Sequence, residues 1–153
     1  EREHFGIDHA AVHGAVLIQT AMPATAAGVL VTTNIYDRRD KTTYTINAKR
    51  GVGMRVVEGH RVPEQILYDY EKRSVKILSR SDDDVMLVAD ENGGVKEVKI
   101  DKGQVVLTHR RTATLSEMSR QLVEVFPKEH PLDIEWLFVD NELHIVQSRP
   151  FMQ

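Results

Sequence analysis

Two short segments near the end of the chain could place four polar side chains on one surface. Asp133 and Glu135 are two residues apart, and so are Gln147 and Arg149. Because side chains of a strand alternate between its faces, each pair lies on one face of its strand. Carboxylate and amide oxygens suit Mg²⁺, which proteins usually hold with one or two carboxylates together with substrate phosphates. Arginine binds phosphate through its bidentate fork. This spacing predicts half of a nucleotide-triphosphate site; an exposed strand face with alternating polar residues is the alternative.

A hairpin must bring the two pairs together. The apolar patterns of 132–139 and 143–148 are typical of strands, and Asp140, Asn141 and Glu142 form a polar turn between them. An antiparallel hairpin over these ranges would place both carboxylates, the carboxamide and the guanidinium side by side.

Most of the remaining chain has the pattern of short strands with turn residues between them. Strands are expected at 15–19, 28–33, 42–48, 65–70, 74–78, 85–89 and 95–100. One helix is expected over 114–126, because Thr114 and Glu117 form a capping box and Pro127 stops it. A shorter helix could start at Met54. The expected fold class is α+β: a mostly antiparallel sheet with a few helices and a β-hairpin excursion around residues 65–107.

Composition excludes several classes of protein. The 153 residues carry a net charge of -3, with 41% hydrophobic and 28% charged residues. These values argue against disorder, and the weak acidity offers no basic stripe for nucleic acid. No run approaches the roughly 18 apolar residues of a membrane span. The absence of cysteine excludes disulfides and thiol catalysis and is consistent with a cytoplasmic location. We therefore expect a protein that binds neither membrane nor nucleic acid.

Three blocks, which together extend over about residues 15–150, follow one another in the order of a known family pattern. Residues 19–32 resemble Q-x-M-V-x-A-D-x-S-G-V-L-F-T. Residues 47–48, 51–53, 56–59 and 62–64 resemble I-N-A-x-x-G-L-G-E-x-V-V-x-G-x-x-T-P-D. Residues 133–136 and 143–150 resemble D-I-E-W…L-x-I-L-Q-x-R-P. Together the blocks resemble the ATP-grasp nucleotide-binding domain of the phosphoenolpyruvate synthase and pyruvate phosphate dikinase family. The fold implied is the C-terminal part of an ATP-grasp domain.

The resemblance implies roles for the C-terminal residues. Glu135 would be a ligand of Mg²⁺, with Gln147 beside it, and Asp133 would support the cofactor site. Arg149 would bind the triphosphate and stabilise charge on the transferred phosphoryl group, in a reaction that depends mostly on positioning and electrostatics. The cofactors implied are ATP and Mg²⁺.

The resemblance also implies an adenine-binding hinge at residues 19–23. Gln19 would begin it, backbone groups of Ala21 and Met22 would bond the base, and Met22 would pack on it. A simple exit from a strand into a loop is the alternative. The loop Gly51-Val52-Gly53 could let backbone approach a ligand, or could be only a tight structural turn.

The chain departs from the family pattern at four positions, namely Thr25, Ala27, Met54 and Val62, where the family usually has Asp, Ser, Glu and Thr. In this family an earlier subdomain supplies further phosphate-binding cations, and a separate domain carries a phosphorylated histidine. Only residues 1–14 precede the strand expected at 15–19 that leads into the hinge, too few for that subdomain. The domain with the phosphorylated histidine is not expected in this chain either. We expect residues 1–153 to be a single domain from a larger enzyme, with those other domains and ATP as its partners.

The resemblance therefore implies the ATP- and Mg²⁺-binding portion of a dikinase-like phosphotransferase. ATP phosphate would pass through a histidine on another domain to an acceptor such as pyruvate, and the isolated chain would be inactive. A non-catalytic or regulatory nucleotide-binding domain of the same fold is the alternative, motivated by Thr25 and Met54. A β-rich interaction module without nucleotide is a third possibility.

Overall fold

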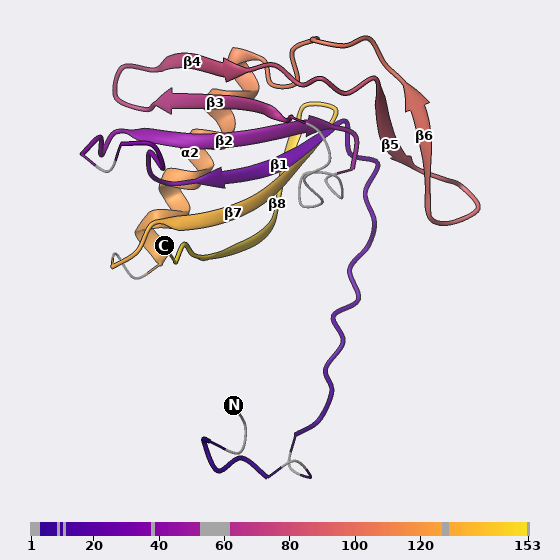
Figure 1. Cartoon of the computed structure of the whole chain (residues 1–153), viewed down its shortest axis with the longest axis vertical. Helices are drawn as coiled ribbons and strands as arrows, with labels where there is room; N and C mark the ends of the chain where they lie inside the picture. Colours follow the sequence, from indigo (N-terminus) through magenta and orange to yellow (C-terminus); the bar gives the residue numbers. More distant parts are fainter. Residues whose placement is uncertain are drawn as a thin grey trace.

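A computed structural model describes residues 4–8, 10, 12–37, 39–52, 62–126 and 129–152. Within these ranges, eight strands and one helix are defined (Figure 1). In chain order they are β1 (Ala26–Val31), β2 (Thr43–Arg50), β3 (Glu64–Asp69), β4 (Ser74–Ser79), β5 (Val85–Ala89), β6 (Val95–Lys99), α2 (His109–Val125), β7 (Leu132–Val139) and β8 (Glu142–Pro150).

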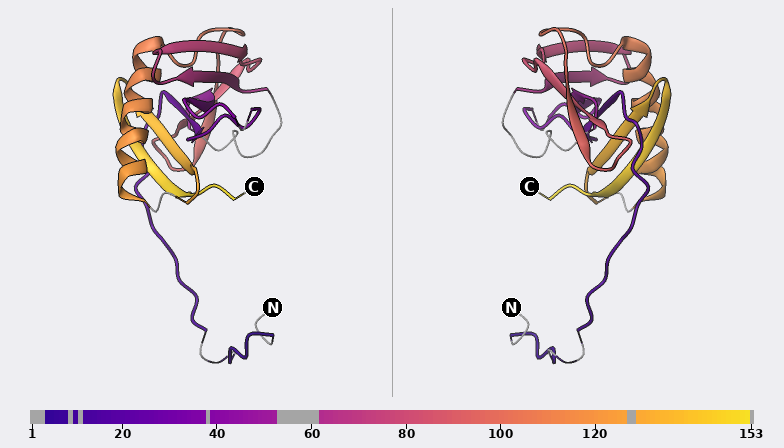
Figure 2. Two further views of the ribbon diagram at one scale, coloured as in Figure 1. Left: turned by 90° about the vertical axis from the view of Figure 1, so that its left-hand side faces the viewer. Right: turned by 90° about the vertical axis from the view of Figure 1, so that its right-hand side faces the viewer.

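Six of these strands form one antiparallel sheet in the order β4-β3-β2-β1-β7-β8, and β5 and β6 form a separate hairpin. Figure 2 shows α2 lying along one face of the six-stranded sheet. The opposite face, turned away from α2, is called the open face below. This arrangement confirms the expected α+β class with a mostly antiparallel sheet. The hairpin excursion expected around residues 65–107 is shorter than predicted, because β3 and β4 pair with the main sheet and only β5 and β6 form the separate hairpin.

The core lies between the sheet and α2, and strand alternation explains how it forms. In β7 every second residue is buried, namely Leu132, Ile134, Trp136 and Phe138, and each of these has 1% or less of its surface exposed. Gly28 on the neighbouring strand makes room for the indole, because a Cβ there would lie 2.7 Å from Cζ2 of Trp136. The intervening residues of β7 therefore face the other way, onto the open face.

The helix begins earlier than the capping box predicted. The hydroxyl of Thr108 caps it by accepting from the backbone N–H of Arg111 at 3.3 Å, and the first helical residue is His109. The hydroxyl of Thr114 instead donates to the carbonyl of Arg110 at 3.0 Å, inside the helix. The prediction was wrong because the first turn contributes a small polar residue, Thr112, to the buried face. A search for apolar periodicity overlooks such a turn.

The strand expected at 15–19 is absent. Val16, Leu17 and Ile18 are 87%, 88% and 92% exposed, and this part of the chain runs away from the sheet (Figure 1). The apolar, β-branched composition favours a strand, but a strand needs a partner to hydrogen-bond. None of the described strands pairs with these residues.

A buried carboxylate connects β3 to the segment that precedes α2. Glu64 is 0% exposed and accepts hydrogen bonds from the backbone N–H groups of Val106 and Leu107, at 3.1 and 2.9 Å. Arg80 donates to it at 2.7 Å. Because these donors come from two separate parts of the chain, Glu64 fixes the path by which the chain crosses from the hairpin to α2.

The hairpin of β5 and β6 has the strands expected from its sequence, and its base joins the main sheet at Gly51. Gly51 bridges Leu87, and a Cβ on Gly51 would lie 2.1 Å from the Leu87 carbonyl oxygen. Its φ of 75° also favours glycine. This close contact gives Gly51 a structural reason to be glycine. Among the described residues, no helix is long and apolar enough to cross a membrane.

Candidate functional site

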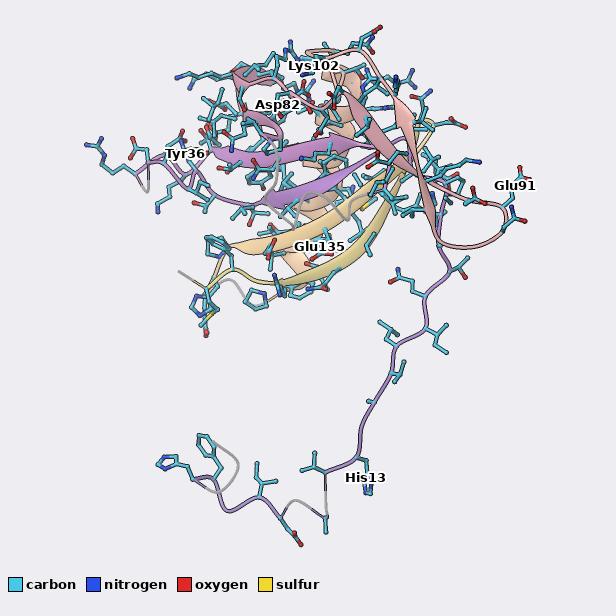
Figure 3. All side chains as sticks on the ribbon, turned by 45° about the vertical axis from the view of Figure 1, so that its right-hand side comes forward. His13, Tyr36, Asp82, Glu91, Lys102 and Glu135 are labelled. Atoms are coloured by element: carbon cyan, nitrogen blue, oxygen red, sulfur yellow. The ribbon has the colours of Figure 1, made fainter. Side chains whose placement is uncertain are left out.

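A continuous row of residues crosses the open face of the sheet. Strand register places Gln65 opposite Asn47, Asn47 opposite Val29, Val29 opposite Glu135, and Glu135 opposite Gln147. These five residues are called the central row, and Figure 3 labels Glu135 within it. Directly opposed side chains in an antiparallel pair have Cβ atoms about 4.5–5.5 Å apart. The sheet therefore brings together Glu135 and Gln147, as the sequence predicted, and adds two amides that it did not.

The neighbouring row contains the other predicted pair. Asp133 lies opposite Arg149. Nε of Arg149 donates to Oδ2 of Asp133 at 3.0 Å, and Nη2 lies 2.8 Å from the same oxygen. The Asp133 side chain is 14% exposed and that of Arg149 is 60% exposed. The guanidinium is therefore bonded to the carboxylate through Nε and Nη2, while much of the arginine side chain remains accessible to solvent.

Glu135 and Gln147 make no side-chain hydrogen bond or ion pair with another described residue. Their oxygens form a hard donor set that fits Mg²⁺, provided that other oxygens complete its coordination. In the described part of the chain, no three His, Asp or Glu residues form a group that could hold a metal by themselves. The donor set therefore fits a cation that arrives with phosphate oxygens rather than one in a closed protein site.

A third row, toward the end of the sheet where β1 begins, has an apolar centre. Lys49 lies opposite Ala27, Ala27 opposite Leu137, and Leu137 opposite His144. Lys49 is a buried cation at 3% exposure, and its Nζ lies 3.4 Å from Oδ1 of Asp83. This pairing neutralises Lys49, so the row offers no free positive charge. Its apolar residues are Ala27, which is 4% exposed, and Leu137, which is half-buried.

Asn47 is the clearest functional candidate that sequence reasoning did not assign to the site. It shares the central row with Glu135, and its Oδ1 is buried without a hydrogen-bond partner among the described residues. A buried polar atom without a partner is uncommon in native structures. Its motif, Asn47-Ala48, was recognised in the sequence, but only the strand register shows that it faces the same surface as Glu135.

The predicted hinge residues lie before the sheet. Gln19 and Ala21 are exposed and Met22 is half-buried, with its carbonyl accepting from the N–H of Ala24 at 2.8 Å. These hinge residues do not pack against the central row, and their contact with adenine stays a prediction. Gly53 and Met54, including the predicted short helix, lie outside the described residues.

Thr25 has a structural role that explains one departure from the family pattern. Its backbone N–H and its hydroxyl both donate to the carbonyl of Phe138, at 2.7 and 3.1 Å. Its own carbonyl accepts from the N–H of Gly51 at 3.1 Å. Thr25 therefore joins the start of β1 to the end of β7. The departure at Thr25 therefore gives no reason to exclude a ligand site at the central row.

A cavity of about 780 Å³ on the α2 side of the sheet is the competing site. It lies between α2 and the turn after β3, and Arg120 lies on its wall. That guanidinium is 3.4 Å from Glu117 and 5.5 Å from the ring centre of Tyr70. Arg73 and His109 also line it, and Glu117, the carboxylate among its described lining residues, is paired with Arg120. Because these lining residues offer no unpaired carboxylate and amide like Glu135 and Gln147, the open face is the stronger candidate for binding a triphosphate together with Mg²⁺.

Comparison with known proteins gives a match over the whole chain. The family described as pyruvate phosphate dikinase, AMP/ATP-binding domain, matches residues 1–153. A rifampicin phosphotransferase of Streptomyces sviceus is 32% identical over 152 residues, which are 97% of this chain and 17% of that protein. A probable phosphoenolpyruvate synthase of Methanocaldococcus jannaschii is 30% identical over 155 residues. One of Methanothermobacter thermautotrophicus is 28% identical over 151 residues.

Each of the two probable synthases is matched by 97% of this chain, which covers 12% of the first and 22% of the second. The chain therefore spans between about an eighth and a fifth of the length of these relatives. Their names refer to rifampicin and to phosphoenolpyruvate, while the matched region is common to them.

Proposed function

The chain belongs to the family of AMP/ATP-binding domains of pyruvate phosphate dikinases, and from this premise we propose that it is the ATP- and Mg²⁺-binding part of a dikinase-like phosphotransferase. Residues 1–153 would act as one folding unit within a larger enzyme. The observation that supports this proposal best is the register of β7 and β8, which aligns Glu135 with Gln147 and Asp133 with Arg149 on the open face. The hairpin alone therefore brings together the four side chains from which a half-site was predicted.

In this proposal the three rows divide the nucleotide between them. Ala27 and Leu137 form an apolar floor for the base, next to the point where the hinge enters β1. Glu135 and Gln147 would hold Mg²⁺, which neutralises phosphate charge when bound. Arg149 faces the phosphates one row further along.

The reaction would transfer a phosphoryl group from ATP to a histidine on another domain, and from there to an acceptor such as pyruvate. A P–O bond of ATP breaks, a P–N bond to the imidazole forms, and the nucleotide leaves with the bridging oxygen. Arg149 would stabilise the charge on the equatorial oxygens during this step. The relatives are named for rifampicin and for phosphoenolpyruvate, so the acceptor would be chosen by parts of the enzyme outside this chain. The cytoplasmic location stays a prediction.

The test uses the full-length protein that contains this chain, incubated with radiolabelled ATP and Mg²⁺. We expect an acid-labile label on the protein, as for phosphohistidine. Glu135→Gln and Arg149→Met should slow labelling by about 100-fold or more, as is typical when one group that stabilises transition-state charge is removed. Glu142→Gln, at the exposed start of β8, is the matched control and should label at the wild-type rate. Unchanged labelling in both site variants would refute the proposal.

A non-catalytic nucleotide-binding domain is the second candidate. The departure at Met54 motivates it. The departure at Thr25 does not, because Thr25 has a structural role in joining β1 to β7. In that case the full-length protein would bind Mg²⁺-ATP, and Glu135→Gln would weaken binding, but no label would transfer.

A further inference from the structure

The contact between Asp133 and Arg149 uses one particular edge of the guanidinium. Arginine has five N–H donors in a planar group, arranged along two edges that can each bind two acceptors. Asp133 binds the edge formed by Nε and Nη2, and both nitrogens contact the same carboxylate oxygen, Oδ2. The edge formed by Nη1 and the remaining Nη2 hydrogen makes no hydrogen bond or ion pair with a described residue.

We propose that Asp133 is a positioning residue that holds Arg149 so that its free edge faces the triphosphate, rather than a ligand of Mg²⁺ or of the nucleotide. This inference rests on the proposed function and assigns Asp133 a role different from the supporting role expected from the sequence.

The relative burial of the two side chains supports this direction of action. Asp133 is 14% exposed, whereas Arg149 is 60% exposed. The carboxylate is therefore the more buried member of the pair, and the group that a ligand meets first is the cation. An exposed carboxylate beside a triphosphate would repel it, but a carboxylate bonded to arginine is already neutralised.

The distance along the strands places Arg149 within reach of a phosphate held at the central row. The pair of Asp133 and Arg149 is two residues from the pair of Glu135 and Gln147 on both strands. At 3.3–3.4 Å per residue this is about 7 Å, less than the length of a triphosphate chain. A phosphate bound near Glu135 could therefore extend to the free edge of Arg149.

Without Asp133, the long and exposed Arg149 side chain would sample many rotamers, and its charge would seldom be aligned with the transferred group. A loss of alignment lowers the rate of the chemical step, while attraction between the cation and ATP remains. The expected signature of Asp133→Asn is therefore a fall in kcat of about tenfold with a KM for ATP that is unchanged or lower.

The experiment is a double-mutant cycle in the full-length protein, measured by single-turnover labelling with ATP. Asp133→Asn, Arg149→Met and the double variant are compared, with Glu142→Gln as the control on the same hairpin. If Asp133 acts through Arg149, Asp133→Asn costs about tenfold in the wild-type background and less than twofold when Met occupies position 149. Equal losses in the two backgrounds would overturn the inference.

The concentration of Mg²⁺ that gives half-maximal rate separates positioning from metal binding. Asp133→Asn should leave this concentration unchanged, whereas Glu135→Gln should raise it. A raised requirement in Asp133→Asn would show that Asp133 is a ligand and would overturn the inference. That outcome would leave the proposed function intact, since the function fails only if Glu135→Gln and Arg149→Met retain wild-type labelling.

Discussion

Removal of the buried Glu64 carboxylate should destabilise the fold more than removal of any exposed carboxylate. In Glu64→Ala the backbone N–H groups of Val106 and Leu107 lose their acceptor. A buried donor left without a partner costs about 1–3 kcal/mol, so the two together give about 2–6 kcal/mol. Arg80 adds little, because its side chain is 39% exposed and can turn to solvent. Removing the desolvated carboxylate offsets part of this loss. We therefore expect a net loss of about 3 kcal/mol.

The measurement is urea unfolding followed by the fluorescence of Trp136, the one tryptophan of the chain, which is 1% exposed. With an m-value of about 1–3 kcal/mol per molar urea, the midpoint should fall by about 1–3 M. Glu64→Gln keeps one acceptor oxygen and should lose about half as much. Glu91→Gln at the exposed turn of the β5–β6 hairpin is the matched control, labelled in Figure 3, and should stay within about 0.5 kcal/mol of wild type.

A loss below about 1 kcal/mol in Glu64→Ala would refute the reasoning, because it would mean that the chain before α2 does not depend on this carboxylate. A loss in Glu91→Gln equal to that in Glu64→Gln would refute it as well, since the effect would then follow net charge rather than the buried hydrogen bonds.

Three further predictions concern other parts of the sheet. Gly28→Ala should lower the free energy of unfolding in urea by about 3 kcal/mol or more. The added Cβ would lie 2.0 Å from the Asn47 carbonyl oxygen and 2.7 Å from the Trp136 ring, so a variant as stable as the wild type would contradict this packing. The ammonium of Lys72 and nearby backbone N–H groups hold the pKa of Asp69 below its ordinary value of 3.8. The stability that Asp69 contributes is complete above its unfolded-state pKa and is lost as pH falls through its lower folded-state pKa. Asp69→Asn should therefore be less stable than the wild type at pH 7, and its free energy of unfolding should fall less between pH 5 and 2. An equal fall in the two proteins would contradict this prediction. Asn47→Ala should raise the KM of the full-length protein for ATP about tenfold if Oδ1 meets the nucleotide, and an unchanged KM would exclude that contact.

Local sequence patterns predicted most of the strands, because alternation over a few residues reflects one buried face. The C-terminal hairpin was predicted with its side-chain faces correct, since the period of two places Glu135 on the face of Asp133 and Gln147 on the face of Arg149 whatever the surrounding fold. The strand order could not be obtained in this way, because it depends on contacts between distant segments. The position of Asn47 on the central row is therefore known only from the register of β2 with β1.

The failures have physical causes in particular residues. Composition alone predicted a strand at Val16, Leu17 and Ile18, but a strand also requires a partner, which the described residues do not provide. The buried ion pair of Lys49 with Asp83 could not be predicted from the sequence pattern, because the two residues are 34 positions apart. The early start of α2 was missed because Thr112 is buried although it is polar.

Whether the open face holds Mg²⁺ and ATP together is tested by the affinity of the full-length protein for ATP, measured by calorimetry with Mg²⁺ and again with a chelator. If Glu135 and Gln147 on the open face hold Mg²⁺ with the phosphates, Mg²⁺ should tighten ATP binding in the wild type, and this gain should disappear in Glu135→Gln while binding without Mg²⁺ stays the same. Glu142→Gln should keep the full gain. An undiminished Mg²⁺-dependent gain in Glu135→Gln would contradict the account.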